Sequence, residues 1–295
     1  MSNLISITGH LCNDYIITVD EYPPVGESRR VVNRETFFGG GAANIAVGIA
    51  TLGGESELIS AVGKDFPGSP YERHLQELGI KTTFFTSEKN CSTAFMVNTT
   101  AGEQITYFEW GAGEVFSKAS APKREFVHMA TGDAEFNIKV AKNADFASLD
   151  PGQDVKYYSK EELEELFGNI DILICNIFEL NIMKDTLGYS SSDIFKAVPM
   201  AIITEGKKGS TIHADSGKTQ ISSCVVDAMD PTGAGDAYRA GLFTAWKRGY
   251  DIETCCKVGA VVSSFAVEKI GTQTNLPNWE MMENRYRTFF KGGLS

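Results

Sequence analysis

The sequence predicts an α/β protein with three layers, in which helices cover both faces of a doubly wound, mostly parallel sheet. Two observations lead to this fold class. Short apolar runs alternate with helical patterns along most of the chain, which is the pattern of a parallel sheet wrapped by helices. The length of 295 residues also suits one α/β unit that carries a small extra sheet. We therefore expect residues 1–295 to form a single domain.

Six short runs have the apolar composition of parallel strands that are buried on both faces. They are residues 5–10, 57–62, 126–130, 146–149, 172–175 and 201–204. A hairpin is expected next, with strands at 211–214 and 219–222. Its turn, residues 216–219, ends like a phosphate-binding Walker loop, but the first glycine of such a loop would fall at Ile212.

Helix signals fill the gaps between these strands. Ser69 and Pro70 open a helix at 71–78 that Gly79 ends. The segment Ser159-Lys160-Glu161-Glu162 is a capping box that opens a helix at 160–167, and Gly168 stops it. The last third of the chain predicts three more helices, at 235–248, 252–269 and 279–290.

Two regions interrupt the alternation of strands and helices. Residues 28–38 and 93–110 have the composition of strands, and the second region is expected to be a hairpin that turns near residues 99–102. Apolar residues alternate along it at Phe95, Val97, Ile105 and Tyr107. A small sheet inserted in this way predicts a lid that projects from the main body.

Composition excludes several classes of protein. The net charge of −11 argues against a broad nucleic-acid-binding surface, which needs clustered Lys and Arg. An apolar run long enough to span a membrane is not found, and the start of the chain has no secretory leader, so we expect a cytosolic protein. Six cysteines and four histidines lack metal-site spacing, which favours reduced, buried thiols and no zinc site.

The most informative segment is Asp230-Pro231-Thr232-Gly233-Ala234-Gly235-Asp236. The small residues Gly233, Ala234 and Gly235 let the backbone approach an anion, and the helix that starts there offers unpaired N–H groups. Asp236 in the first turn is placed to accept a proton from a hydroxyl group. An anion site next to a base predicts phosphoryl transfer.

This segment resembles the carboxy-terminal signature of the ribokinase family of carbohydrate and nucleoside kinases. Three further motifs follow the order of that family. Gly39 to Ala46 resembles its glycine-rich substrate loop, Asn176-Ile177-Phe178-Glu179 its magnesium motif, and residues 204–209 its nucleotide loop. Within the family the chain is most similar to archaeal-type nucleoside kinases, through residues 110–112, 128–133, 150–154, 238–241 and 271–277.

The resemblance implies roles for individual residues. Asp14, which would otherwise be interpreted as a turn residue, would accept hydrogen bonds from ribose hydroxyls, with Gly40 and Asn44 adding donors. The acceptor would also contact Arg30, Thr106, Tyr107, Phe108, Gln153 and Asp236. ATP would contact Gln104, Asn176, Thr204, Glu205, Gly206, Lys207, Lys208 and Gly209. Glu179 would hold Mg²⁺ through water, because magnesium keeps much of its hydration.

The function implied is an ATP- and Mg²⁺-dependent kinase that phosphorylates the ribose 5′-hydroxyl of a nucleoside. A sugar or sugar-phosphate kinase is the alternative, since the cation of Arg30 stands where the family resemblance leads us to expect an amide. A nucleoside-binding sensor without catalysis is a third possibility, disfavoured by the intact base Asp236. The resemblance also implies a homodimer formed through the lid, while the need for a monovalent cation stays open.

Overall fold

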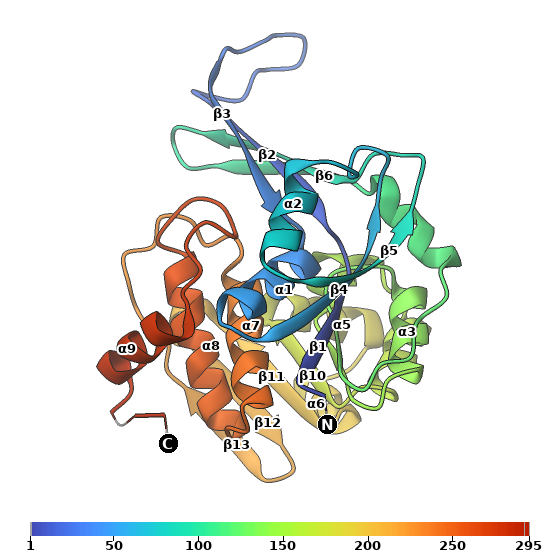
Figure 1. Cartoon of the computed structure of the whole chain (residues 1–295), viewed down its shortest axis with the longest axis vertical. Helices are drawn as coiled ribbons and strands as arrows, with labels where there is room; N and C mark the ends of the chain where they lie inside the picture. Colours follow the sequence, from blue (N-terminus) through green and yellow to red (C-terminus); the bar gives the residue numbers. More distant parts are fainter. Residues whose placement is uncertain (1, 292, 295) are drawn as a thin grey trace.

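The computed structural model describes residues 2–291, 293 and 294, which form a sheet of nine strands and a sheet of four (Figure 1). The nine strands are β1 (Leu4–Thr8), β4 (Glu55–Val62), β5 (Lys81–Thr86), β8 (Val127–Met129), β9 (Ala147–Leu149), β10 (Ile172–Asn176), β11 (Met200–Thr204), β12 (Ser210–Ala214) and β13 (Gly217–Ile221). Their order across the sheet is β13-β12-β11-β10-β9-β8-β1-β4-β5. The strands from β11 across to β5 in this order pair in parallel, and β12 and β13 extend the β11 edge in the antiparallel sense.

Helices cover both faces of this sheet, which confirms the three-layer prediction. One face carries α1 (Gly41–Thr51), α2 (Pro70–Glu77), α7 (Ala234–Lys247) and α8 (Ile252–Ala266), with α9 (Trp279–Phe289) packed on α8. The other face carries α3 (Ala134–Lys142), α4 (Lys160–Phe167), α5 (Ile177–Leu187) and α6 (Ser191–Ala197). Three short 3₁₀ helices complete the described part of the chain, at Gly111–Lys118, Gly152–Tyr157 and Gly206–Lys208.

The alternation of side chains along each strand divides the core in two. In β10, Ile172 and Ile174 pack with α1, α7 and α8, while Leu173 and Cys175 pack on the opposite face with α4 and α5. Because both faces are covered, strand residues are apolar at consecutive positions rather than at alternate ones.

Capping residues place α4 at its predicted bounds and α2 within one residue of them. Ser159 and Glu162 form the reciprocal capping box of α4, which runs over Lys160–Phe167 as predicted. The Ser69 side chain accepts a hydrogen bond from the Glu72 N–H at the start of α2. The predicted hairpin of residues 211–222 is also present, as β12 and β13.

The four-stranded sheet projects from one end of the body, at the top of Figure 1. Its strands are β2 (Cys12–Val19), β3 (Val31–Gly39), β6 (Ser92–Thr99) and β7 (Gln104–Glu109), in the order β3-β2-β6-β7. Strands β2 and β6 run parallel, and the two outer pairs are antiparallel. The turn between β6 and β7 is closed by a hydrogen bond from Gly102 N–H to Thr99 O. We call this unit the lid sheet.

Two strands were not predicted. β5 was overlooked at one edge of the large sheet, and β2 was overlooked at the centre of the lid sheet. Asp14 was expected in a loop at the end of the first strand, where Asn13 and Asp14 would be a turn without the family resemblance, but both residues lie in β2. Pairing with β3 on one side and β6 on the other satisfies their backbone groups, so tertiary context overrides the local preference of these residues for turns.

The cysteine prediction is confirmed for the described residues, where all six thiols are buried and none forms a disulfide. Within the same residues, the structure contains no helix with the length and apolar character needed to cross a membrane.

Candidate active site

A cleft of about 210 Å³ lies between the lid sheet and the amino-terminal ends of α1 and α7. We call it the lid cleft. Nine predicted site residues line it: Asp14, Gly40, Asn44, Gln104, Thr106, Phe108, Gln153, Gly233 and Asp236. The remaining lining residues were not predicted: His10, Cys12, Gly41, Ala94, Met96, Thr131, Thr232 and Thr272. The lid sheet therefore supplies apolar residues as well as Asp14, Gln104 and Thr106, and the body adds further polar groups.

Asp14 is a carboxylate held inside the lid cleft, where it is 7% exposed. Strand β3 makes room for it at Gly39, since a Cβ atom there would lie 2.1 Å from Asp14 Oδ2. Burial raises the pKa of Asp14 to about 6; a hydrogen bond with Cys12 lowers it, and the negative charge of Asp236 raises it further. Near neutral pH the group is an ionised hydrogen-bond acceptor.

Asp236 lies on the other side of the lid cleft, in the first turn of α7. Its Oδ2 accepts a hydrogen bond of 2.8 Å from Nδ2 of Asn44. Burial raises the pKa of Asp236 to about 6, and both the Asn44 hydrogen bond and the nearby Arg239 guanidinium oppose that rise. A carboxylate with this pKa is ionised at neutral pH and basic enough to take up a proton.

A hydrogen-bond network fixes Asn44 in the orientation that Asp236 needs. Oδ1 of Asn44 accepts from Thr272 Oγ1 at 2.9 Å and from Gln273 Nε2 at 2.8 Å, so its Nδ2 is left to donate to Asp236. Gln273 also donates to the hydroxyl of the buried Tyr71 at 3.0 Å. Thr272 and Gln273 lie in segment 271–277, whose family resemblance implied no role for either residue.

The amino terminus of α7 presents free backbone donors. Gly233, at φ 78°, precedes the helix, and no described side chain caps it. The Ala234 N–H donates to Pro231 O, whereas the N–H groups of Gly235 and Asp236 have no partner among the described residues. Two unpaired donors and the positive end of the helix dipole make this turn an anion site.

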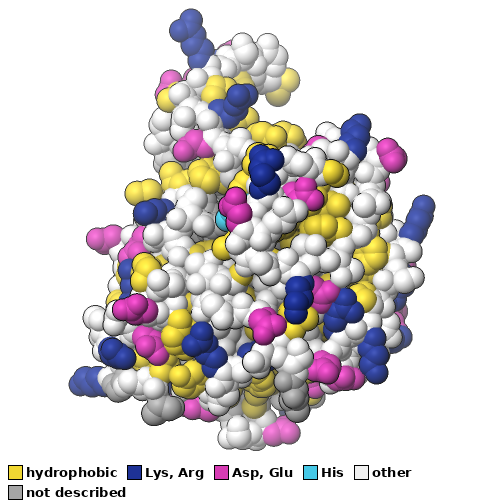
Figure 2. Space-filling view, in the orientation of Figure 1, with side chains coloured by type: hydrophobic (Ala, Val, Ile, Leu, Met, Phe, Trp, Pro, Cys, Tyr) yellow, Lys and Arg dark blue, Asp and Glu magenta, His cyan; other side chains and the backbone are white. Residues whose placement is uncertain are grey.

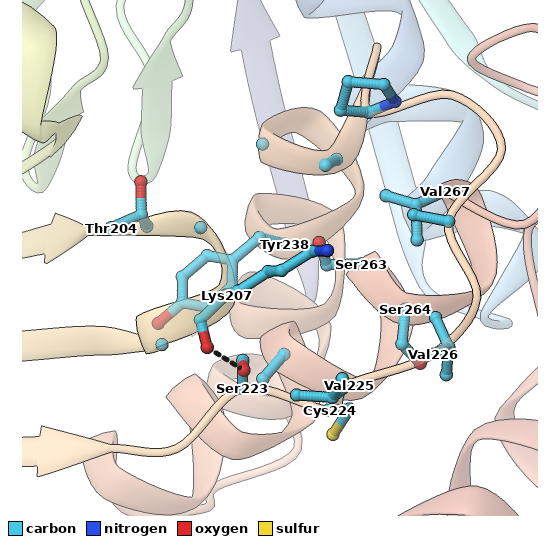
Figure 3. A pocket seen from close by; sticks show the side chains of 17 residues that line it. Thr204, Lys207, Ser223, Cys224, Val225, Val226, Tyr238, Ser263, Ser264 and Val267 are labelled. Atoms are coloured by element: carbon cyan, nitrogen blue, oxygen red, sulfur yellow. Dashed lines mark hydrogen bonds between the residues drawn. The ribbon is translucent and has the colours of Figure 1, made fainter.

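A second cavity, of about 230 Å³, opens on the opposite side of the same turn (Figure 3). We call it the helix pocket. Six predicted residues line it: Thr204, Gly206, Lys207, Gly209, Ala234 and Gly235. Its far wall is largely apolar, with Val225, Val226 and Val267 labelled in Figure 3. An elongated ligand in this pocket can direct one end at the amino terminus of α7.

Most hydroxyl groups of the helix pocket are already engaged by other protein groups. Ser223 donates to the backbone oxygen of Lys207 at 2.6 Å, drawn as a dashed line in Figure 3. The Tyr238 hydroxyl pairs with Ser210 at 2.8 Å, and Ser264 donates to Val261 O at 2.7 Å. The pocket therefore offers shape and backbone groups more than free side-chain donors.

Asn176 and Glu179 stand at the carboxyl end of β10, beside the N-terminal turn of α7. Asn176 caps α5, and both carboxylate oxygens of Glu179 accept hydrogen bonds from Asn176, at 2.8 and 2.7 Å. Burial raises the pKa of Glu179 to about 7, and the neighbouring Asp150 raises it further. The described residues contain no cluster of three His, Cys, Asp or Glu that could enclose a metal ion. A single carboxylate that can act together with the phosphate oxygens of a bound nucleotide nevertheless matches the way proteins bind Mg²⁺.

A buried ion pair lies beneath this turn, and its role was not predicted. Nε of Arg239 lies 2.7 Å from Oδ2 of Asp150, and the two side chains are 4% and 7% exposed. Both residues were quoted only within segments that resemble archaeal nucleoside kinases. A stronger signal was available, because Arg239 is a charged residue in an otherwise apolar stretch of α7, three positions after Asp236.

Several predicted residues lie elsewhere than expected. Arg30 is exposed on the loop before β3, and Tyr107 is 64% exposed, so neither lines the lid cleft. Tyr107 differs from Thr106 and Phe108 because successive side chains of a strand point to opposite faces. Gln104 had been assigned to ATP but lines the lid cleft. Glu205 and Lys208 do not line the helix pocket, whereas Lys207 does.

Comparison with known proteins identifies relatives along almost the whole chain. The sequence profile of the pfkB family carbohydrate kinases matches residues 2–279. A nucleoside kinase of Methanocaldococcus jannaschii is 41% identical over 290 residues, which cover 95% of this chain and 96% of that protein. The crystal structure of M. jannaschii nucleoside kinase, described as an archaeal member of the ribokinase family, superposes with a TM-score of 0.92 at 38% identity, covering 97% of this chain and 99% of that one. The structure of a Burkholderia thailandensis nucleoside kinase in complex with inosine superposes with a TM-score of 0.87 at 25% identity. The match covers 98% of this chain and 100% of that one.

Proposed function

This chain belongs to the pfkB family of carbohydrate kinases, and we propose that it transfers the γ-phosphoryl group of ATP to the ribose 5′-hydroxyl of a nucleoside. One observation supports this proposal above the others. The lid cleft and the helix pocket meet at the amino terminus of α7, where Asp236 faces the first and Gly235 faces the second. Acceptor and donor can therefore approach each other across a single anion-binding turn.

Asp236 acts as the base in this reaction. Its carboxylate takes the proton of the acceptor hydroxyl as that oxygen forms a bond to phosphorus, and the bond from phosphorus to ADP breaks. The free N–H groups of Gly235 and Asp236 stabilise the charge on the phosphoryl oxygens during the transfer. Asn44 fixes the orientation of the base.

Glu179 would hold Mg²⁺ together with the phosphates of the donor. When bound, it neutralises charge on the donor phosphates. Glu179 suits this task because its carboxylate is half-buried and oriented by Asn176.

The acceptor is a nucleoside rather than a sugar phosphate. Two carboxylates, Asp14 and Asp236, face the lid cleft, and no Lys or Arg among the described residues lines it. A phosphorylated sugar would meet negative charge without a cation to pair with. The apolar side chains of Met96 and Phe108 offer instead a surface on which a nucleobase can pack.

The lid sheet closes over the acceptor and also joins two copies of the chain. Its cleft-facing side meets the acceptor, while its outer face exposes apolar side chains, with Tyr107 64%, Ile105 39% and Phe95 38% exposed. An outer face of this kind suits a homodimer, since exposed apolar area on a lid is otherwise costly in water.

The proposed function is tested by assaying inosine, guanosine, adenosine, cytidine, ribose and fructose 6-phosphate at equal concentration with MgATP. We expect kcat/KM for the best nucleoside to exceed that for ribose by more than about 100-fold, because the base adds buried apolar contacts. A ranking led by ribose or fructose 6-phosphate would replace the nucleoside with a sugar. Release of inorganic phosphate without any phosphorylated acceptor would argue against the kinase itself.

A further inference from the structure

Arg239 is a buried cation that the mechanism above does not use. It lies on α7 one turn after Gly235, is 4% exposed, and is surrounded along the helix by buried apolar residues. Isolated buried charges are costly, so a guanidinium in this position needs strong partners. Burial lowers the pKa of Arg239, but the carboxylates of Asp150, Glu179 and Asp236 outweigh that effect and hold it above its ordinary value.

The contact with Asp150 anchors only one edge of the guanidinium. Nε lies 2.7 Å from Oδ2 of Asp150, without the alignment of a hydrogen bond. Among the described residues, no hydrogen bond uses Nη1 or Nη2 of Arg239, and neither atom is fully enclosed. Nη1 and Nη2 of Arg239 are therefore free to donate hydrogen bonds to a bound ligand.

Gly235 determines what this free edge faces. A Cβ atom at Gly235 would lie 2.5 Å from Nη1 of Arg239, so the guanidinium packs directly beneath the backbone of the anion-binding turn. Gly235 also lines the helix pocket, which we assign to the donor. Nη1 of Arg239 therefore lies next to a residue that the donor phosphates are expected to contact. Any side chain at this position would separate the cation from the turn.

The unused Nη–H groups of Arg239 are hydrogen-bond donors, so the partner that the protein does not supply is a hydrogen-bond acceptor. Asp150, Glu179 and Asp236 surround one guanidinium, and Asp14 lies across the lid cleft. Donor phosphates brought into such an acidic site need fixed positive charge in addition to a metal ion. Arg239 is the cation that the structure buries there.

We propose that Arg239 is a catalytic residue whose Nη1–H group donates a hydrogen bond to the phosphoryl group during its transfer, while Asp150 anchors the guanidinium from below. This inference rests on the proposed kinase function. The bond from phosphorus to the ADP oxygen breaks, the bond to the acceptor oxygen forms, and the acceptor proton goes to Asp236. Arg239 keeps its own proton and stabilises the oxygens on which negative charge is distributed.

The competing explanation is that Arg239 only neutralises Asp150. Removing one partner of a buried ion pair destabilises a protein strongly, whereas replacing both by neutral groups is often tolerated. The single variants Arg239→Met and Arg239→Lys are therefore compared with the double variant Asp150→Asn/Arg239→Met. If Arg239 acts on the phosphoryl group, the double variant regains thermal stability but not activity.

We expect kcat of the double variant to be on the order of 10²–10³-fold below that of the native protein, with KM for the nucleoside nearly unchanged. Arg239→Lys should retain more activity than Arg239→Met, because it keeps the charge but lacks the planar fork. A control is the pair Glu57→Gln/Arg124→Met, which removes a different ion pair, Arg124 Nη2 to Glu57 Oε1 at 2.6 Å, that is partly buried and lies outside both cavities. That control should leave kcat within about twofold of the native value.

Donor binding tests the same inference without an acceptor. Calorimetry with Mg²⁺ compares ADP with the β,γ-methylene analogue of ATP. The double variant should lose about tenfold or more in affinity for the analogue and little for ADP, because only the analogue places a third phosphate at Arg239. Recovery of native kcat in the double variant, or unchanged binding of the analogue, overturns the role of Arg239. If the native protein phosphorylates no nucleoside, the proposed function fails, while the binding comparison still decides about Arg239.

Discussion

Asp236 is partly buried, accepts a hydrogen bond from Asn44 and lies at the start of a helix, and these features predict how it responds to pH. Since burial raises its pKa to about 6, kcat should fall as the pH drops below about 6 and the base becomes protonated. Asp236→Asn keeps the size of the side chain but removes the base, so kcat should fall roughly 10²–10⁴-fold at pH 7.5 while ATP still binds. Steady-state kinetics with nucleotide-binding calorimetry measure both effects.

The same substitution makes a prediction about stability. A carboxylate whose pKa is raised by folding costs stability when it is ionised, and this cost is present above the folded pKa and vanishes below the unfolded one. Asp236→Asn should therefore raise the free energy of unfolding at pH 7 by up to about 3 kcal/mol and by much less at pH 4. Near-native turnover of this variant would contradict the assignment of Asp236 as the base.

Asp14 is predicted to act on the acceptor alone. Asp14→Ala deletes the hydrogen-bond acceptor that we assign to ribose hydroxyls, so KM for the nucleoside should rise by about tenfold or more while KM for ATP changes little. Glu35→Ala on the neighbouring strand β3 is a suitable control, because Glu35 is exposed. Equal increases in both KM values would assign Asp14 to folding instead.

The sequence predicted the site best where the proposed chemistry and the local backbone conformation require the same residue types. The stretch Gly233 to Asp236 could be predicted as an anion site next to a base because small residues, a helix start and a carboxylate coincide there. Tyr107 could not be placed, since the side of a strand that faces a cleft depends on register, which the local sequence does not determine. Arg30 lies on the loop before β3, outside the strand that was predicted to include it. Arg239 was overlooked because its partner Asp150 is distant in the sequence and only the fold brings them together.

At the scale of elements, the lid sheet is the part most able to move. Strand β3 is exposed over most of its length and forms one edge of that sheet, whereas β10 is buried at the centre of the body. Residues 31–39 and 92–109 should therefore exchange amide hydrogens faster than residues 172–176 in the free protein. Adding nucleoside alone should slow exchange in the lid sheet and leave β10 unchanged, as measured by hydrogen–deuterium exchange with mass spectrometry. Equal exchange with and without nucleoside would indicate a static sheet.

The boundaries of α4 and β2 show which elements can be predicted from local sequence signals. Helix α4 was predicted to the residue because its capping box and the glycine after it are both local features. Strand β2 was overlooked because its polar residues are buried only once β3 and β6 pair with it. Helices thus follow from caps and periodicity, while the lid sheet depends on contacts between distant segments.

At the scale of the whole molecule, the surface properties favour one defined dimer contact rather than nonspecific association. Figure 2 shows basic and acidic side chains interspersed on one face of the body. The exposed apolar residues of the lid sheet predict a homodimer through its outer face. The double variant Phe95→Glu/Tyr107→Glu should shift the mass measured by light scattering from dimer to monomer, because it places charge in an apolar contact. Met281→Glu on α9 is a control that should leave the mass unchanged. A native protein that is monomeric at micromolar concentration would rule out the dimer.

The hydrogen bonds of Asn44 also determine when, during synthesis of the chain, the active site can first be complete. Its partner Asp236 lies 192 residues later in the chain and Thr272 lies 228 residues later. A ribosome that adds about 5–20 residues per second needs roughly 10–45 s to pass from Asn44 to Thr272. During synthesis, the glycine loop and the lid strands exist before the base and the donor turn. A nascent chain can therefore form the acceptor side of the site first, and it gains the ability to transfer phosphate only when its last quarter has emerged.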